Sequence, residues 1–432
     1  MKILIICTTF PPYTSIAARR PYMFAKYLSS FGHSVTVICS GLKNAVVDNS
    51  YNEANNSFRV IKYLDESAQS TDNIKQINKK KERIKLMPDF FVNFCFFLYE
   101  PFALYKRHKG YKYDFNRIKL VLDSIKDERY DVIFSTFSEL SNVYAGDYAR
   151  KLFNCKWILD FRDRIYQPSN NSWLWNLLYK STEKKYIERA DMVTSVSEDL
   201  FYGSSYPKEK IVTIYNGYDS ENFVDTLHAK SNGLSFCYTG AVYGARGEAL
   251  KSFFMAVNNL KEKKQIDLND LQFNYAGKDG TEVARLAALY GLKDIVKLHG
   301  FIQPREAEEL QKKADVFVVL SWNFTNNRGI LTGKFYDGIK AGNPILCLLT
   351  GTVPNSELYR LNIKYRYGFC YEQSRKKEDY SDFESYLLDC YHQKQENGQL
   401  SYTMDKNFVN KFNYENLTRE LELLCIKIAN NG

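Results

Sequence analysis

Short apolar runs alternate with helix-length amphipathic stretches along nearly the whole chain. Runs without polar–apolar alternation are typical of strands in a parallel sheet that is covered on both faces. In the first half we expect strands at 2–7, 34–39, 59–63, 131–135, 156–160, 192–195 and 211–214. In the second half we expect strands at 234–239, 272–276, 296–299, 316–320, 345–348 and 369–371. The pattern predicts an α/β fold.

The alternation pauses in a polar stretch at 216–233, and this pause divides the chain. A chain of 432 residues is too long for one ordinary core. We predict two doubly wound, Rossmann-like domains at 1–215 and 234–405, facing a central cleft, with 216–233 as the linker. A C-terminal helix at 406–432 is expected to cross back to the first domain. Ligands of such sheets bind beyond the carboxyl ends of the strands, so residues after each strand are the best candidates.

A glycine-bearing turn, a short helix and a buried strand follow one another from Gly329 onward. A helix beginning at Thr332 would present unpaired N–H groups and the positive end of its dipole. Lys334 lies in the first turn, so dipole and charge together could hold a phosphate. Asp337 lies near the same face and could accept hydrogen bonds from paired sugar hydroxyls. This combination indicates a nucleotide-sugar site; a capped surface helix with solvated side chains is the alternative.

In the first half, candidate residues follow the first and fifth expected strands. Thr9 lies in the turn after the first strand, and Arg20 in the next helix could clamp an anion. After the fifth strand, Asp160, Arg162 and Asp163 place two carboxylates around one guanidinium. Such a group could position a hydroxyl or act as a base. A plain helix turn at Arg20 and a structural ion-pair network after the fifth strand are the alternatives.

In the second half, a strand and a glycine-bearing loop lead to Arg246, which is placed to meet a diphosphate opposite Lys334. A solvated loop arginine is the alternative. The chain has no Asp-x-Asp, and its 5 histidines show no ligand spacing, so no metal site is expected. It also lacks a Gly-x-Gly-x-x-Gly loop, a Gly-x-Ser-x-Gly elbow and a P-loop, which disfavours dinucleotide enzymes, α/β hydrolases and P-loop phosphotransferases.

The net charge of +9 is concentrated around one aromatic segment. Basic runs at 79–85 and 106–112, the second beginning with Lys106 and Arg107, flank a stretch that contains Phe96 and Phe97. This pattern is typical of a helix in an anionic membrane interface, and we predict that 79–112 contacts a membrane. A core helix with solvated basic neighbours is the alternative. Nucleic acid is not an expected partner, because no nucleic-acid-binding module accompanies the charges.

Motifs in both halves resemble those of glycosyltransferase family 4, in particular the members that build bacterial capsules and O-antigens. In the first half they lie at 10–12, 20–22, 157–163, 194–198 and 216–219. In the second half they lie at 298–301, 314–316, 334–337 and 341–344. The resemblance implies a GT-B fold, a nucleoside-diphosphate sugar as co-substrate without a cofactor, and a metal-independent reaction that retains anomeric configuration.

Residue by residue, the resemblance implies that Arg246 and Lys334 bind the donor diphosphate. Asp337 falls on the second acidic residue of the family's Glu-x7-Glu motif, which binds ribose. The first acidic residue would fall at Gly329, which has no side chain. Either backbone groups between Gly329 and Leu331 and another acid hold the sugar, or catalysis is weak or absent.

We therefore predict a cytoplasmic glycosyltransferase, peripheral at the inner face of the plasma membrane. It would move a sugar to a lipid-linked glycan in bacterial surface polysaccharide synthesis, with donor, acceptor and anionic membrane as its partners. The catalytic group Asp160, Arg162 and Asp163 would line the acceptor side of the cleft. A sugar-nucleotide epimerase of the same architecture and a non-catalytic nucleotide-binding subunit are the alternatives.

Overall fold

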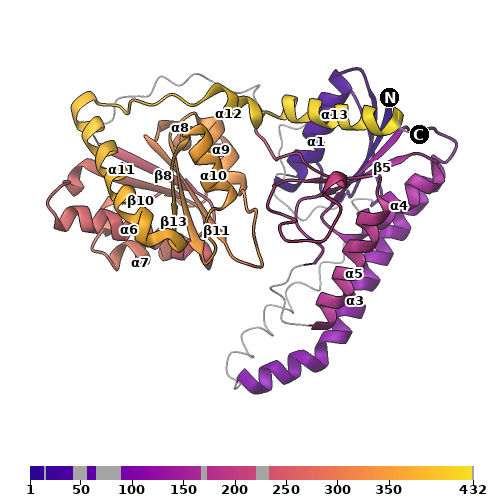
Figure 1. Cartoon of the computed structure of the whole chain (residues 1–432), viewed down its shortest axis with the longest axis horizontal. Coiled ribbons are helices and arrows are strands. Elements are labelled where there is room, and N and C mark those ends of the chain that lie inside the picture. Colours follow the sequence, from indigo (N-terminus) through magenta and orange to yellow (C-terminus); the bar gives the residue numbers. More distant parts are fainter. Residues whose placement is uncertain (14–15, 42–55, 65–88, 167–172, 220–232, 431–432) are drawn as a thin grey trace. The chain divides into compact units, whose positions relative to one another are not determined.

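A computed structural model describes residues 1–13, 16–41, 56–64, 89–166, 173–219 and 233–430 of the chain (Figure 1). The chain forms two compact units, each built on one parallel β-sheet. The first unit consists of Met1–Val196, Ser204–Ile214 and Thr418–Gly432, and the second of Ser197–Gly203 and Tyr215–Leu417. The predicted α/β class with two doubly wound sheets is confirmed.

The sheet of the first unit has seven strands in the order β3-β2-β1-β4-β5-β6-β7, all parallel. Their bounds are β1 (Lys2–Ile6), β2 (Ser34–Cys39), β3 (Arg59–Lys62), β4 (Val132–Phe137), β5 (Lys156–Phe161), β6 (Met192–Ser195) and β7 (Ile211–Thr213). The strand order reverses between β1 and β4, which is where ligands of doubly wound sheets commonly bind. Each strand lies at or beside a run that the apolar pattern predicted.

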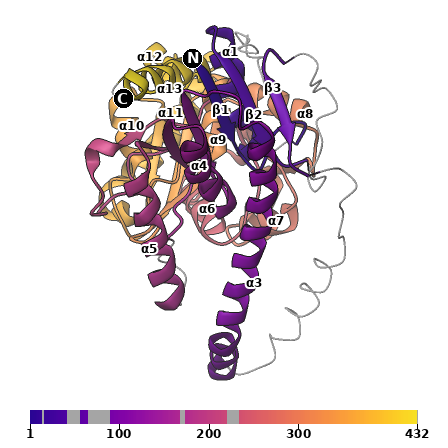
Figure 2. The ribbon, with the colours of Figure 1, turned by 90° about the vertical axis from the view of Figure 1, so that its right-hand side faces the viewer.

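Helices cover the sheet of the first unit. They are α1 (Ile16–Ser30), α3 (Asp89–Ser124), α4 (Leu140–Leu152) and α5 (Trp173–Arg189). Gly146 lets α4 approach the sheet, since a Cβ there would lie 2.5 Å from both the Ser135 Oγ and the Trp157 Nε1. The Trp157 Nε1 in turn donates to the Ser135 Oγ at 2.9 Å. Helix α3 extends well beyond the sheet of its own unit (Figures 1 and 2).

The sheet of the second unit has six parallel strands in the order β10-β9-β8-β11-β12-β13. Its strands are β8 (Leu234–Thr239), β9 (Leu271–Ala276), β10 (Val296–Leu298), β11 (Val316–Asn323), β12 (Ile345–Gly351) and β13 (Gly368–Glu372). Its helices are α6 (Ala245–Glu262), α7 (Gly280–Ala288), α8 (Pro304–Lys313), α9 (Gly333–Ala341), α10 (Glu357–Tyr365), α11 (Lys376–Asn397) and α12 (Lys406–Lys411). Short 3-10 turns are η2 (Lys208–Lys210) in the first unit and η4 (Leu268–Asp270), η5 (Lys293–Ile295) and η6 (Gln373–Arg375) in the second. An aromatic cluster of Phe236, Phe253 and Phe273 fills the core between β8, β9 and α6.

The last helix, α13 (Tyr414–Asn430), contributes its residues from Thr418 onward to the first unit. There the Glu422 carboxylate lies 2.7 Å from the His33 Nε2, and the Arg419 guanidinium lies 4.3 Å from the Phe31 ring centroid. Both contacts are made with the turn and the linker that follow α1. The C-terminal helix is therefore fixed to the first unit by an ionisable pair and a cation–π contact.

Within the part of the chain that the structure describes, no helix is long and apolar enough to cross a membrane. Eight of the 9 cysteines have described side chains, and these are free thiols. All of them except Cys155 are buried.

Candidate functional site

The carboxyl ends of β8 and β11 lie side by side in the second sheet, and the loop after β8 is firmly held there. The Tyr275 hydroxyl donates to the Gly240 carbonyl at 2.8 Å, and the Asp279 carboxylate accepts from the Val242 N–H at 2.8 Å. Gly277 permits this close packing, because a Cβ there would lie 2.3 Å from the Gly240 carbonyl oxygen. The loop therefore offers a fixed backbone surface beyond the sheet.

Lys334 lies over this loop. A Cβ built on Gly240 would be 3.4 Å from the Lys334 Cε, which places the lysine side chain against the end of β8. Burial raises the pKa of the neighbouring Cys237 thiol to about 12, and the positive charge of Lys334 offsets part of that rise. The lysine predicted for a phosphate thus lies at the carboxyl edge of the sheet.

Arg246 lies in the first turn of α6, at the same edge. Its guanidinium lies 5.3 Å from the ring centroid of Tyr243 and 5.3 Å from that of Trp322, which belongs to β11. Burial raises the pKa of Tyr238 in β8, and Arg246 lowers it in part. The two cations predicted at the donor diphosphate are therefore both placed at the ends of β8 and β11.

Helix α9 begins at this edge without a side-chain cap. Thr332 has the extended backbone of an N-cap residue, but its hydroxyl makes no cap hydrogen bond and its Oγ1 is buried without a partner. Lys334 pairs instead with Asp337, with the Nζ and Oδ2 atoms 2.9 Å apart. Their side chains are 30% and 20% exposed. The residue predicted to bind phosphate and the residue predicted to bind ribose therefore neutralise each other's charge at a partly solvated position.

Gly329 has no room for a side chain. Its φ is +71°, and a Cβ there would lie 2.0 Å from the Ser197 Oγ and 2.8 Å from the Leu200 N. The following residues are also fixed, because the Ser321 hydroxyl donates to the Ile330 carbonyl at 2.8 Å and the Leu331 N–H to the Gly329 carbonyl at 3.2 Å. The resemblance places an acidic residue here, and the structure shows why this chain has glycine instead.

In the first unit, Arg20 and Asp160 bind each other. The Arg20 Nη2 lies 2.8 Å from the Asp160 Oδ1 and its Nε lies 3.1 Å from the Oδ2, and both side chains are 0% exposed. The Thr194 hydroxyl also donates to the Asp160 Oδ1 at 2.7 Å. Asp160 is thus part of a structural ion pair, the alternative that the sequence left open for the group after the fifth strand, but its partner is Arg20, for which the sequence left open only a plain helix turn.

The other candidates of the first unit lie in the loops that follow β5 and β1. The Arg162 Nη1 donates to the Ala17 carbonyl, at the start of α1, at 3.3 Å. Asp163 is solvent-exposed. Nearby protein atoms still desolvate its carboxyl group and raise its pKa, and the positive charge of Arg162 offsets part of that rise. Thr9 is half-buried in the loop between β1 and α1. Arg162, Asp163 and Thr9 thus lie in the loops that follow β5 and β1, where the sequence predicted an acceptor site.

The predicted membrane segment lies partly outside the described residues. Lys106 and Arg107 are exposed on α3. Phe96 and Phe97 belong to α3, but their side chains, like residues 79–88, lie outside what is described. The neighbouring α5 exposes Leu177 and Leu178, which are 61% and 45% accessible, beside exposed lysines at 180, 184 and 185.

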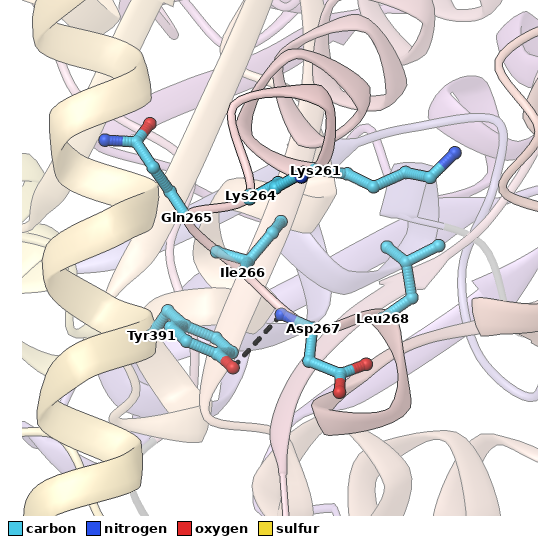
Figure 3. Close-up of a pocket in the computed structure, with 7 residues that line it drawn as sticks. All are labelled: Lys261, Lys264, Gln265, Ile266, Asp267, Leu268 and Tyr391. Carbon is cyan, nitrogen blue, oxygen red and sulfur yellow. Dashed lines mark hydrogen bonds between the residues drawn. The ribbon is translucent and has the colours of Figure 1, made fainter.

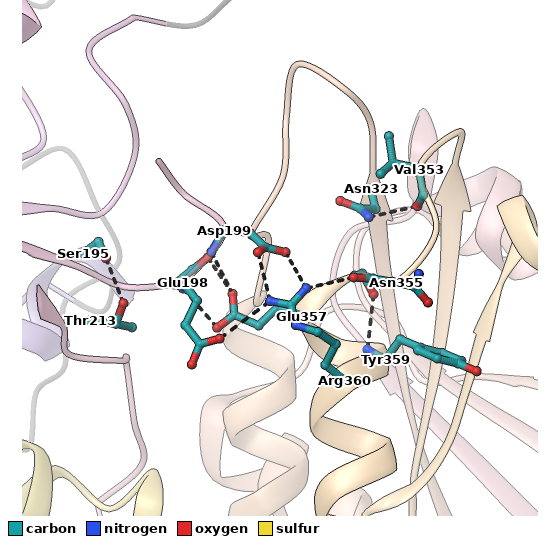
Figure 4. A network of polar contacts seen from close by, with 12 residues as sticks. Ser195, Glu198, Asp199, Thr213, Asn323, Val353, Asn355, Glu357, Tyr359 and Arg360 are labelled. Carbon is teal, nitrogen blue, oxygen red and sulfur yellow. Dashed lines mark hydrogen bonds and ion pairs between the residues drawn. The ribbon is translucent and has the colours of Figure 1, made fainter. Parts of the chain in front are cut away.

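Sequence reasoning missed Glu357, the first residue of α10. The residue is 2% exposed, and its carboxylate accepts hydrogen bonds from the segment Ser197–Gly203, as Figure 4 shows for Glu198 and Asp199. A position just after β12 is the only signal that could have identified it. Trp322 was missed as well, because its contact with Arg246 joins residues far apart in the sequence.

A surface hollow of about 590 Å³ lies elsewhere, at the end of α6 (Figure 3). Its lining residues are Lys261, Lys264, Gln265, Ile266, Asp267, Leu268 and Tyr391. The Tyr391 hydroxyl accepts from the Asp267 N–H at 3.1 Å across it. Because α6 begins at the carboxyl end of β8, its other end lies away from Arg246 and Lys334. Among the side chains that the structure describes, no group of three or more His, Cys, Asp or Glu could hold a metal ion.

No family model matches the sequence, and no curated protein matches it by sequence. Solved structures resemble it over their whole length. A glycosyltransferase from Rickettsia africae has 16% identity and a TM-score of 0.58, covering 100% of this chain and 99% of its own. The lipopolysaccharide outer core galactosyltransferase WaaB has 12% identity and a TM-score of 0.59, covering 99% of both chains.

HepE from Anabaena, solved in complex with UDP-glucose, has 12% identity and a TM-score of 0.59, covering 99% of this chain and 100% of its own. At these identities the likeness shows the fold alone. The chain shares the two-domain GT-B fold of these glycosyltransferases, as the resemblance predicted.

Proposed function

We propose that the protein is a glycosyltransferase that moves a sugar from a nucleoside-diphosphate sugar to a glycan acceptor. The observation that supports this most directly is the placement of Lys334, Arg246 and the uncapped start of α9 at one edge of the second sheet. A diphosphate leaving group develops negative charge as the sugar departs. Two cations and a helix N-terminus are suited to stabilise that charge.

The pair between Lys334 and Asp337 would open when donor binds. A partly exposed pair of this kind contributes at most about 1 kcal/mol, whereas a diphosphate offers the lysine a stronger partner. Asp337 would then be free to accept hydrogen bonds from the ribose hydroxyls. We propose that the two cations serve in place of a divalent metal and that transfer retains anomeric configuration, as in glycosyltransferase family 4.

We further propose that the acceptor is a lipid-linked glycan of bacterial surface polysaccharide synthesis, reached at the inner face of the plasma membrane. Exposed lysines and Arg107 on α3 and exposed Leu177 and Leu178 on α5 support this, because basic and apolar groups together suit an anionic interface. The residues around Arg162 and Asp163 would line the acceptor side.

The membrane proposal is tested by vesicle sedimentation with the Lys106→Gln/Arg107→Gln variant. Each basic residue contributes about 1 kcal/mol near an anionic surface, so we expect binding to phosphatidylserine-containing vesicles to fall about 10- to 30-fold. Lys293→Gln/Lys297→Gln removes two exposed charges from the second unit and is the matched control. Equal binding by the two double variants would contradict the assignment of this surface.

A non-catalytic nucleotide-binding subunit is the second candidate, and the packing of Gly329 favours it. The segment Ser197–Gly203 fills the space in which a catalytic carboxylate would stand, so the donor site could bind without promoting transfer. An epimerase, the remaining alternative, would need neither an acceptor nor a membrane surface.

The function is tested with a panel of UDP-, GDP- and ADP-sugars, measuring binding by calorimetry and donor hydrolysis by release of the nucleoside diphosphate. We expect one nucleotide class to bind and Lys334→Ala to weaken it about 10- to 100-fold, since a hydrogen bond to a charged group contributes about 1.5–3 kcal/mol. Lys340→Ala is the matched control on the same helix, where Lys340 pairs with Glu308. Binding without hydrolysis or transfer would favour the non-catalytic subunit, and no binding at all would refute the proposal.

A further inference from the structure

The segment Ser197–Gly203 is held by the second unit, although the strands before and after it, β6 and β7, belong to the first sheet. Residues of α10 make hydrogen bonds and an ion pair with this segment. The Glu357 Oε2 accepts from the Ser197 hydroxyl at 2.7 Å, and its Oε1 accepts from the Glu198 N–H at 3.0 Å. The Tyr215 hydroxyl donates to the same Oε1 at 2.7 Å. A buried carboxylate thus satisfies donors from two separate parts of the chain.

One turn further along α10, Arg360 adds a second link. Its two terminal nitrogens lie 3.0 Å and 2.9 Å from the two carboxylate oxygens of Asp199, a bidentate pair (Figure 4). Bidentate arginine–carboxylate pairs fix orientation as well as distance. Together, Glu357 and Arg360 determine where the backbone of residues 197–199 lies.

The same segment also lies against the loop that leads into α9. The Ser197 hydroxyl and the Leu200 N–H occupy the space beside Gly329, where a side chain would otherwise stand. The Tyr202 ring lies under the neighbouring Arg328, with the guanidinium 4.2 Å from its centroid. The segment therefore fills the gap between α10 and the loop that ends at Thr332.

We propose that Glu357 is a positioning residue of the donor site. It holds Ser197–Gly203 against Gly329 and so fixes the loop from which α9 and Lys334 begin. In this chain the segment Ser197–Gly203, held by Glu357, thus occupies the space of the side chain that is missing at position 329. The inference rests on the proposed function, because its effect is read at the donor site.

The test uses the full-length protein with Glu357→Gln. Glutamine has the size of glutamate, but its amide nitrogen cannot accept the hydrogen bond that one carboxylate oxygen accepts from the Asp199 N–H. We expect the donor KM and the Kd of the nucleoside diphosphate to rise about 10-fold or more, with the acceptor KM unchanged, since losing one hydrogen bond to a charged group weakens binding roughly 10- to 100-fold.

The matched control is Glu384→Gln. Glu384 is also a buried carboxylate of the second unit, and it accepts from Asn259 and Lys263 at α6. Both variants should lower the unfolding midpoint, so donor affinity is measured per folded protein below that midpoint. Equal donor Kd and KM in the two variants would overturn the inference.

A second variant keeps the test decisive if Glu357→Gln does not fold. Ser197→Ala removes one donor to Glu357 and leaves the carboxylate in place. We expect a smaller loss of donor affinity in the same direction, and unchanged affinity would overturn the inference. A wild-type protein that binds none of UDP, GDP and ADP would refute the proposed function itself, which is a different outcome.

Discussion

Each unit contains one cation–carboxylate pair built from residues that the sequence marks as ligand-binding candidates. In the first unit, Arg20 and Asp160 are completely buried and doubly hydrogen-bonded. In the second unit, Lys334 and Asp337 are joined by one contact and remain partly exposed. The same chemistry therefore has different consequences, because burial decides whether a charge is available to a ligand.

The buried pair cannot exchange its partner without a large desolvation penalty. Removing water from two charges is costly, and the pair is tolerated because each charge satisfies the other. Thr194 supplies a further hydrogen bond to the same carboxylate. The partly exposed pair faces a smaller penalty, so the diphosphate of the proposed donor would be able to replace Asp337 as the partner of Lys334.

The largest expected effect comes from Arg20→Ala. Removing the guanidinium leaves the Asp160 carboxylate buried and without its cation, which destabilises proteins by about 3–5 kcal/mol. Urea unfolding followed by circular dichroism measures the change in free energy of unfolding. A loss below about 1 kcal/mol would show that the pair is not the structural element that its burial indicates.

Lys334→Ala in the same unfolding assay separates the two pairs. Because the contact with Asp337 is partly solvated, its loss should change the free energy of unfolding by less than about 1 kcal/mol. Affinity for the proposed donor should fall about 10- to 100-fold in the same variant. If instead Lys334→Ala were as destabilising as Arg20→Ala, the two pairs would share a structural role.

Much of the fold follows from the apolar pattern of the sequence. Strands such as β1 and β12 are nearly continuous runs of Ile, Leu and Cys, and parallel packing between helices requires this composition. The candidates after β1, β5 and β8 could also be located, because strand ends share one edge of a parallel sheet. Patterns within a few consecutive residues are therefore enough to identify the strands and helices and their order along the chain.

The sequence could not show which candidates face one another. Arg20 and Asp160 are 140 positions apart, and nothing local reveals that each is the other's partner. The contact between Ser197 and Glu357 spans 160 positions, so the role of Glu357 and the reason for glycine at 329 were both hidden. Burial and long-range pairing determine whether a charged residue stabilises the fold or is available to a ligand, and both depend on tertiary packing.

Glu357 differs from the carboxylates of both pairs, because its hydrogen-bond partners are donors without a formal charge. Burial raises the pKa of its carboxyl above the usual 4.5, and hydrogen bonds from Tyr215, the Glu198 N–H and Ser197 offset part of that rise. The ionised form is then less favourable in the folded than in the unfolded protein. Wild-type stability should therefore fall, relative to Glu357→Gln, as pH rises from 4.5 to the folded-state pKa, and stay constant above it.

This pH dependence is the smallest effect expected here, and it is measured as a difference. Urea unfolding of the wild type and of Glu357→Gln at several pH values between about 4 and 8 gives the difference in free energy of unfolding at each pH. The hydrogen bond lost in the glutamine variant changes the difference in free energy of unfolding by the same amount at every pH. It does not make that difference depend on pH, because glutamine does not titrate. If the wild type loses stability relative to Glu357→Gln as pH rises above 4.5, the loss reports the cost of burying an ionised carboxylate. A flat difference, or one that drifts toward the wild type, would mean that the hydrogen-bond donors around Glu357 offset the cost of burying its ionised carboxylate in full.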